Sequence, residues 1–235
     1  MGKIVIAIDG YSGCGKSSTA KAVAKDLGYT YIDTGAMYRA ATLHFLNNHL
    51  SATNPQDVEK GLKSLEISFH LNPENQLQET YLNGLHVDDA IRSMQVSNNV
   101  SRIAALPAVR KDLVAQQQRL AKKKGVVMDG RDVGSVVFPE AELKIFMTAD
   151  LETRAIRRQA ELLEKGETIP LKDIIENLAS RDEIDSTREV GPLIKVEDAI
   201  EVDTSNITFA EQVAFIVNKA REIIDKEKSY ASNHR

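Results

Sequence analysis

A glycine-rich loop between a predicted strand and a predicted helix limits the possible folds of this chain more than any other part of the sequence. Residues 10–17 read GYSGCGKS, a complete G-x-x-x-x-G-K-S motif. An apolar run at residues 3–9 precedes the loop, and a helix-forming stretch at residues 16–27 follows it. Glycines let successive backbone N–H groups turn inward at a helix N-terminus, where they bind an anion. The motif therefore predicts binding of a nucleoside triphosphate.

Two side chains of the loop have expected roles in that binding. Lys16 can reach the β- and γ-phosphates, and the Ser17 hydroxyl can ligate Mg²⁺. The alternative is an ordinary glycine-rich turn before a helix, which the flanking strand and helix disfavour. The residues of the loop that we expect to contact ATP are Gly10, Tyr11, Ser12, Gly13, Cys14, Gly15, Lys16, Ser17 and Ser18.

Composition limits the class of protein. The 235 residues include 30 Lys and Arg against 34 Asp and Glu, a formal net charge of −4, which argues against a general nucleic-acid binder. No apolar run approaches 18 residues, and the first strand begins almost at the N-terminus, so we expect neither a membrane helix nor a signal peptide. The single cysteine suits a reducing compartment. We expect a soluble, cytoplasmic monomer with no nucleic-acid or membrane partner.

Short apolar segments alternate with helical stretches along much of the chain. They lie at residues 3–9, 29–33, 126–130, 143–147 and 199–203. This order predicts an α/β fold with a five-stranded, mainly parallel sheet wrapped by helices on both faces. Ligands of such sheets bind beyond the carboxyl ends of the strands, where Asp9, Asp33, Asp129 and the glycine loop should converge on one cleft.

A period of two interrupts this alternation between residues 65 and 87. Residues 65–71 alternate, residues 72–75 predict a turn, and residues 76–82 predict a second strand. Asn83-Gly84 is a strong hairpin signal before a third strand at residues 85–87. A small antiparallel sheet is therefore inserted into the α/β chain. The remaining helices are predicted at residues 36–49, 57–65, 94–124 with an interruption at Pro107 and a cap at Gly125, 151–164, 171–184 and 209–226.

Two polar clusters follow predicted strands. Thr34 and Arg39 lie close enough in sequence to clasp one phosphate, the alternative being a helix cap followed by a solvated arginine. Asp129 is placed to hold Mg²⁺ through water. In the same turn, Arg131 can bind an acceptor phosphate while Asp132 reads a donor group of the substrate. The alternative here is an exposed turn of ion pairs.

The later helices are rich in arginine, at positions 154, 157, 158, 181 and 188. A solvated helix face is one interpretation. A mobile lid that carries positive charge to a transferring phosphoryl group is the interpretation we favour, with Arg157 as a contact of ATP. Gly166 and the Gly191-Pro192 pair would suit its hinges.

Several motifs in a fixed order carry a resemblance to a known family. They are GYSGCGKS at 10–17, DTGAMYR at 33–39, IR at 91–92, VR at 109–110, DGRDVGSVVFP at 129–139 and RDEIDSTR at 181–188. Together they closely resemble bacterial cytidylate kinase over residues 3–225. The resemblance implies a core body at 1–34, 94–150 and 190–228, a nucleotide-monophosphate-binding sub-domain with the β insert at 35–93, a helical lid at 151–189, and a tail at 229–235.

The resemblance also implies a reaction and roles for individual residues. ATP would phosphorylate CMP, with dCMP as a second acceptor and Mg²⁺ as the cofactor. Lys16, Arg131 and Arg188 would be catalytic. The residues implied for the acceptor are Ser101, Arg110 and Asp132 at the base, Arg181 and Asp185 at the ribose, and Arg39, Arg131, Arg188 and Thr34 at the phosphate, Thr34 standing where the family more often has serine.

Other P-loop functions remain open as alternatives. A different small kinase could act on another nucleoside monophosphate or on a hydroxyl acceptor. A GTP switch normally needs an Asn-Lys-x-Asp motif, and here Asn218-Lys219 is followed by Ala220-Arg221. Length and charge disfavour a nucleic-acid motor. Cys14 is predicted to fill space in the loop, with an oxidisable thiol as the alternative.

Overall fold

The computed structural model describes residues 2–74, 78–164 and 166–233. The chain divides into two compact units. The first unit comprises Met1–Ile32, Gln118–Thr187 and Gly191–Arg235, and the second comprises Asp33–Gln117 and Arg188–Val190.

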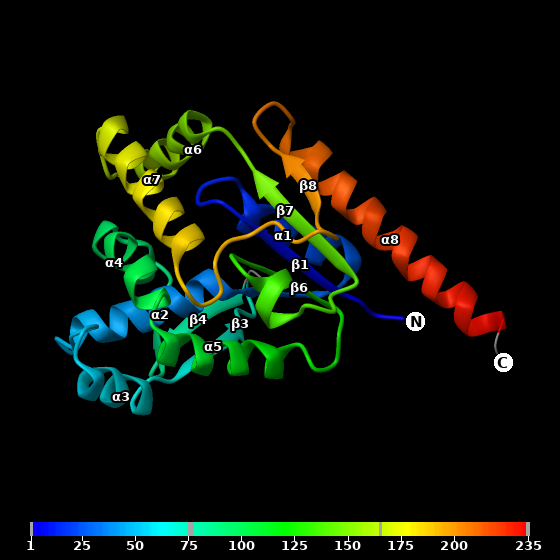
Figure 1. Cartoon of the computed structure of the whole chain (residues 1–235). Helices are drawn as coiled ribbons and strands as arrows, with labels where there is room; N and C mark the ends of the chain where they lie inside the picture. The colour runs from blue at the N-terminus through cyan, green and yellow to red at the C-terminus, as the bar shows by residue number, and fades with distance from the viewer. Residues whose placement is uncertain (1, 75–77, 165, 234–235) are drawn as a thin grey trace. The chain divides into compact units, whose positions relative to one another are not determined.

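The first unit is built on a parallel sheet (Figure 1). Its described residues form five strands in the order β2-β6-β1-β7-β8, which confirms the predicted fold class. The strands are β1 (Val5–Gly10), β2 (Thr30–Asp33), β6 (Val126–Gly130), β7 (Leu143–Thr148) and β8 (Ile200–Asp203). The central strand β1 places Ile8 opposite Asp129 of β6 and opposite Ile145 of β7. The carboxyl ends of these three strands therefore lie at one edge of the sheet.

Helices of the first unit pack on this sheet or on one another. They are α1 (Lys16–Leu27), α6 (Leu151–Glu164), α7 (Leu171–Thr187) and α8 (Phe209–Asn233). Helix α1 contacts β6 and α8, while α6 and α7 pack together as a pair. Helix α8 continues to Asn233, beyond the end expected near Lys226. No helix within the described ranges combines the length and the apolar character needed to cross a membrane.

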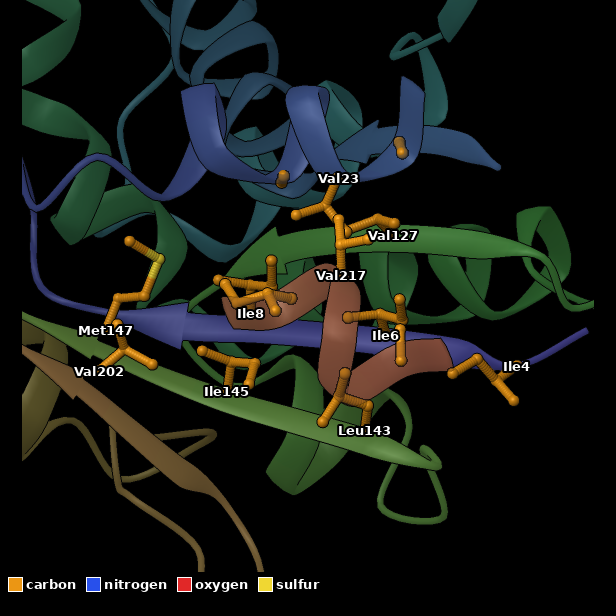
Figure 2. Close-up of a cluster of buried hydrophobic side chains, with 14 of the residues drawn as sticks. Ile4, Ile6, Ile8, Val23, Val127, Leu143, Ile145, Met147, Val202 and Val217 are labelled. Atoms are coloured by element: carbon orange, nitrogen blue, oxygen red, sulfur yellow. The ribbon is translucent and has the colours of Figure 1, made fainter. Parts of the chain in front are cut away.

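The core of the first unit explains the apolar character of its strands. Figure 2 shows Ile4, Ile6 and Ile8 of the β1 segment beside Val23 of α1 and Val217 of α8. Strands with helices on both faces bury successive residues, so they read as continuous apolar runs rather than alternating ones. Each fully buried Ile or Val contributes about 1.5–3 kcal/mol relative to exposure.

The second unit combines helices with the small antiparallel sheet. Its helices are α2 (Thr34–Asn47), α3 (Pro55–Lys63), α4 (Met94–Ala104), α5 (Pro107–Leu120) and the 3₁₀ turn η1 (Ala90–Arg92), and its strands are β3 (Ile67–Leu71), β4 (Gln78–Leu82) and β5 (Leu85–His86). Asn83 and Gly84 have φ of 50° and 79°, as the predicted hairpin requires. The alternation of β3 brings Ile67 and Phe69 against the apolar face of α2. Residues 76 and 77 of the expected second strand lie outside the described residues.

Two local predictions were wrong. The helix that follows Pro107 ends at Leu120 rather than Lys124, and Gly125 is no helix cap because its N–H donates to Ile4 O at 2.9 Å. The turn predicted around residues 129–134 leads into a single π-helical turn, η2 (Val133–Val137), which was not predicted from the sequence. Its Phe138 N–H donates to Val133 O at 2.7 Å.

Candidate functional site

The glycine loop joins the end of β1 to the start of α1, as its motif predicts. Gly10 has φ of +147°, and a Cβ there would lie 2.0 Å from Met147 O, so only glycine fits. Gly13 and Gly15 have φ of +77° and +89°. Gly15 is also the N-cap of α1 and contributes no side-chain cap, which leaves the start of the helix suited to an anion.

Lys16 is buried and bends back over the loop. Its Nζ donates to Tyr11 O at 2.5 Å and lies 3.7 Å from Cys14 Sγ. Burial lowers the pKa of Lys16, and the positive charge of Arg131 lowers it further. Cys14 is fully buried in the main core, and its thiol donates to Tyr11 O at 3.1 Å. The buried thiol fits the space-filling role better than the oxidisable one.

Ser17 and Asp129 meet as the metal hypothesis requires. The Ser17 hydroxyl donates to Asp129 Oδ2 at 2.8 Å, and the Tyr31 hydroxyl donates to Asp129 Oδ1, also at 2.8 Å. A hydroxyl and a carboxylate are the hard oxygen ligands that Mg²⁺ prefers, so these residues fit that ion. The residues that the structure describes contain no group of three or more His, Cys, Asp or Glu suited to a metal, so Mg²⁺ would depend on phosphate and water for its other ligands. Sequence reasoning missed Tyr31, which lies on β2, 98 residues from Asp129.

Asp9, the penultimate residue of β1, holds the turn that follows β6. Its Oδ1 accepts from Val133 N at 2.8 Å and its Oδ2 from Gly134 N at 2.7 Å. Burial raises the pKa of Asp9 to about 6, against the lowering effect of these two bonds and of Lys16. Sequence reasoning expected Asp9 at a strand end but gave it no partner.

Arg131 links the loop to the end of α7. Its Nε donates to Asp185 Oδ2 at 2.8 Å, and its Nη2 donates to Ser12 Oγ at 3.1 Å. Burial alone would lower the pKa of Arg131, but the nearby acidic groups, Asp185 foremost, together outweigh burial and the net shift is upward. The structure thus brings together three residues that lie in three separate motifs.

A second arginine holds the loop from α6. Arg154 donates to Ser12 O at 3.1 Å and to Ala149 O at 2.9 Å. Its guanidinium also pairs with Asp182 of α7 and lies 5.2 Å from the centroid of the Tyr11 ring. Asp182 Oδ1 also accepts from Ser12 N at 3.4 Å. Sequence reasoning gave Asp182 no role, because nothing in the R-D-x-x-D spacing shows which acid faces the loop.

The other arginines of the later helices differ in their surroundings. Burial, and then the charge of Arg131, lowers the pKa of Arg181 to about 10. Its buried Nε has no hydrogen-bond partner within the described residues. Arg157 donates to Thr204 Oγ1 and O at 3.0 and 2.6 Å, and Thr204 Oγ1 in turn bonds Cys14 O. Arg158 pairs with the exposed Glu161, as on an ordinary helix face.

The second unit contains the other predicted phosphate residues. Asp33 is the N-cap of α2, accepting from Ala36 N at 2.8 Å, and Thr34 is the first residue of that helix. Arg39 is held rather than solvated, since its Nη1 donates to Ile91 O and Ser97 Oγ at 3.2 and 3.1 Å. Arg188 lies in the short segment Arg188–Val190.

The predicted base readers fall in both units. Arg110 is buried on α5, where its Nη1 donates to Ala104 O at 3.1 Å. Its guanidinium carbon lies 5.4 Å from the centroid of the Tyr38 ring. Ser101 is buried on α4. Asp132 belongs to the first unit and immediately precedes η2.

The sheet and the loop define a class of protein. The central strand of a parallel sheet ends in the glycine loop, a helix follows at once, and the aspartate of the neighbouring strand bonds the loop serine. This is the arrangement of a P-loop protein that binds a nucleoside triphosphate. The family model for cytidylate kinases matches residues 6–222, and the chain belongs to the cytidylate kinase family.

Individual relatives agree with this membership. The chain is 56% identical to a cytidylate kinase of Cytophaga hutchinsonii, over 94% of each chain. It is 50% identical to one of Bacteroides fragilis, over 95% of this chain and 99% of the relative. Among solved structures, an uncharacterized protein from Eubacterium ventriosum matches with a TM-score of 0.52 at 11% identity, over 94% of this chain and 99% of that one. That likeness concerns the fold alone.

Proposed function

We propose that this protein transfers the γ-phosphoryl group of ATP to CMP, giving ADP and CDP, and that dCMP is a second acceptor. Family membership over nearly the whole chain supports the reaction. The observation that carries the chemistry is Arg131, which bridges Ser12 of the phosphate loop and Asp185 of α7. A cation in that position can serve the donor and the acceptor phosphates together.

The donor triphosphate would lie on the glycine loop. Backbone N–H groups at the start of α1 would bind the phosphate oxygens, and Lys16 would turn from Tyr11 O to the β- and γ-phosphates. Ser17, and Asp129 through water, would hold Mg²⁺, which supplies positive charge to the phosphate oxygens when bound. Arg157, fixed through Thr204 to Cys14 O, is proposed at the ATP side.

The acceptor would be recognised by its base, ribose and phosphate. Asp132 would accept from the exocyclic amino group of cytosine, while Arg110 and Ser101 would donate to the acceptor atoms of the ring. Asp185 and Arg181, whose buried Nε has no hydrogen-bond partner in the part of the chain that the structure describes, are proposed at the ribose. Thr34, Arg39, Arg131 and Arg188 are proposed at the phosphate.

For phosphoryl transfer at this site, the protein has to position the two nucleotides and supply positive charge, and little else. The attacking phosphate oxygen is already anionic, so neither a covalent intermediate nor a strong general base is required. The arginines would orient this oxygen in line with the γ-phosphorus and stabilise the charge that develops there. We propose that residues 151–189 act as a lid that excludes water, that 35–93 act as the acceptor sub-domain, and that the protein works as a cytoplasmic monomer.

A panel of acceptors tests this function. ADP release would be measured with ATP and Mg²⁺ and, in turn, CMP, dCMP, UMP, AMP and hydroxyl acceptors. We expect CMP to be fastest, because a wrong base leaves a buried donor or acceptor unpaired at a cost of about 1–3 kcal/mol, or about 5- to 150-fold in rate. Faster release with AMP or with a hydroxyl acceptor would replace the proposal by a different kinase. Hydrolysis stimulated only by DNA or RNA would indicate a motor.

A further inference from the structure

The carboxylate of Asp9 joins the two chain segments that the proposed reaction needs together. Asp9 immediately precedes Gly10, the first residue of the phosphate loop. Its two oxygens accept from Val133 N and Gly134 N at 2.8 and 2.7 Å, across more than 120 residues of sequence. The two backbone groups it holds directly follow Arg131 and Asp132.

The turn held by Asp9 has an unusual backbone. Asp132 has φ of −145° and ψ of 27°, and the π-helical turn η2 begins at the next residue. Single π-turns are rare and occur frequently at functional sites. A Cβ on Gly134 would lie 3.4 Å from Asp9 Oδ2 and 3.3 Å from the Lys144 side chain, so the turn fits closely against Asp9. The position of Asp132 therefore depends on the bonds made by Asp9.

We propose that Asp9 is a positioning residue, whose ionised carboxylate fixes the Arg131–Asp132 segment for the acceptor through the N–H groups of Val133 and Gly134. The proposal rests on the proposed function, because it takes Arg131 and Asp132 as acceptor residues. Asp9 itself touches no substrate in this proposal and acts through the turn.

The surroundings of Asp9 indicate a functional rather than a stabilising carboxylate. Asp9 is buried, and Asp132 adds a repelling negative charge, while Lys16 and the two N–H groups favour ionisation. Burial outweighs the favourable groups, so ionised Asp9 costs folding free energy. A buried charge that costs stability is typical of a site where position or charge matters to function.

The phosphate loop has independent supports that do not involve Asp9. Arg154 Nη1 holds Ser12 O at 3.1 Å, and Thr204 Oγ1 holds Cys14 O at 3.1 Å. Loss of the Asp9 carboxylate should therefore disturb the turn with Arg131 and Asp132 more than the donor loop.

Asp9→Asn in the full-length protein tests the proposal. The two N–H groups bond different oxygens of Asp9, and an amide replaces one of these oxygens by an NH₂ group that only donates, so one of the two N–H groups would face a donor. We expect the KM and the equilibrium dissociation constant for CMP to rise about tenfold or more, and those for ATP to rise less than about threefold. The urea-unfolding midpoint at pH 7 should not fall.

Glu142→Gln is the matched control. Glu142 immediately precedes β7, its Oε2 accepts from Val5 N at 2.8 Å at the opposite end of β1, and it also pairs with Lys124. This variant therefore removes a carboxylate that bonds the same strand as Asp9 but lies far from the loop. We expect it to lower stability while leaving the KM for CMP unchanged.

Two results would overturn the positioning role of Asp9. One is unchanged CMP binding and turnover in Asp9→Asn. The other is an equal loss for CMP and ATP together with a lower unfolding midpoint, which would make Asp9 a purely structural residue. If wild type prefers another acceptor, the proposed function fails, and the same comparison with that acceptor still decides the role of Asp9.

Discussion

Replacing Asp9 by asparagine should change how stability depends on pH. Burial raises the pKa of Asp9 from its ordinary value of 3.8 to about 6 in the folded protein. One pKa unit corresponds to about 1.36 kcal/mol, so protonated Asp9 contributes about 3 kcal/mol to the free energy of unfolding at low pH. Because the folded state holds this proton more tightly, wild type loses that stability as the pH rises from about 3.8 through 6. Asparagine does not titrate, so the variant loses no stability from this position as the pH rises.

The assay is urea unfolding of both proteins at a series of pH values from 3.5 to 7. The other carboxylates titrate in both proteins, so the difference between the two unfolding free energies isolates Asp9, apart from its coupling to Asp132 and Lys16. We expect wild type to lose up to about 3 kcal/mol relative to the variant over this range. The difference should level off above the folded pKa.

Glu142→Gln should give the opposite sign and so serves as the internal control. Burial alone would raise the pKa of Glu142, but hydrogen bonds from Lys124, from the Val5 N–H and from its own backbone N–H, together with the charge of Lys124, lower it overall. Wild type should therefore gain stability relative to this variant as the pH rises. Parallel curves for wild type and Asp9→Asn, or a difference that grows in favour of wild type, would refute the reasoning about Asp9.

Four further predictions concern the site. Gly10→Ala should give little folded protein in thermal unfolding, because its Cβ would lie 2.0 Å from Met147 O; a normal midpoint would contradict the close packing. Arg188→Ala should cut turnover with CMP far more than it alters ATP binding by calorimetry, and unchanged kinetics would remove Arg188 from the proposed site. Ser17→Ala should weaken Mg²⁺-dependent ATP binding about tenfold, but not metal-free binding, in parallel titrations. Peroxide should inactivate wild type and Cys14→Ala equally, since the Cys14 thiol is buried; selective protection by the substitution would favour the oxidisable thiol.

Much of the fold could be predicted because its signals are local. The glycine positions of the loop need backbone angles that few other residues adopt, and the continuous apolar strands need cover on both faces. Asn83-Gly84 specified its hairpin in the same way. The prediction at Gly125 was wrong because that residue bonds to Ile4, which lies 121 positions earlier in the chain.

The contacts between the residues of the site could not be predicted from the sequence. The motif after β6 identified Asp129 and Arg131 as candidates, and the family resemblance identified Asp185. Neither gave any sign that Arg131 would join Asp185 to Ser12, or that Tyr31 would bond Asp129. Such partners depend on which strands are neighbours. The strand order β2-β6-β1 is a property of the whole sheet.

Residue types and their spacing were enough to predict a phosphate loop on a parallel sheet and the resemblance to cytidylate kinases. Those properties follow from residue types at short spacing. The burial of Asp9 against Val133 and Gly134, which raises its pKa to about 6, depends on the folded chain. Burial and hydrogen bonding depend on which residues lie close together in space, whatever their separation in the sequence. The pairing of β1 with β6 places Asp9 opposite Gly130, and the turn that follows β6 brings the N–H groups of Val133 and Gly134 to its carboxylate.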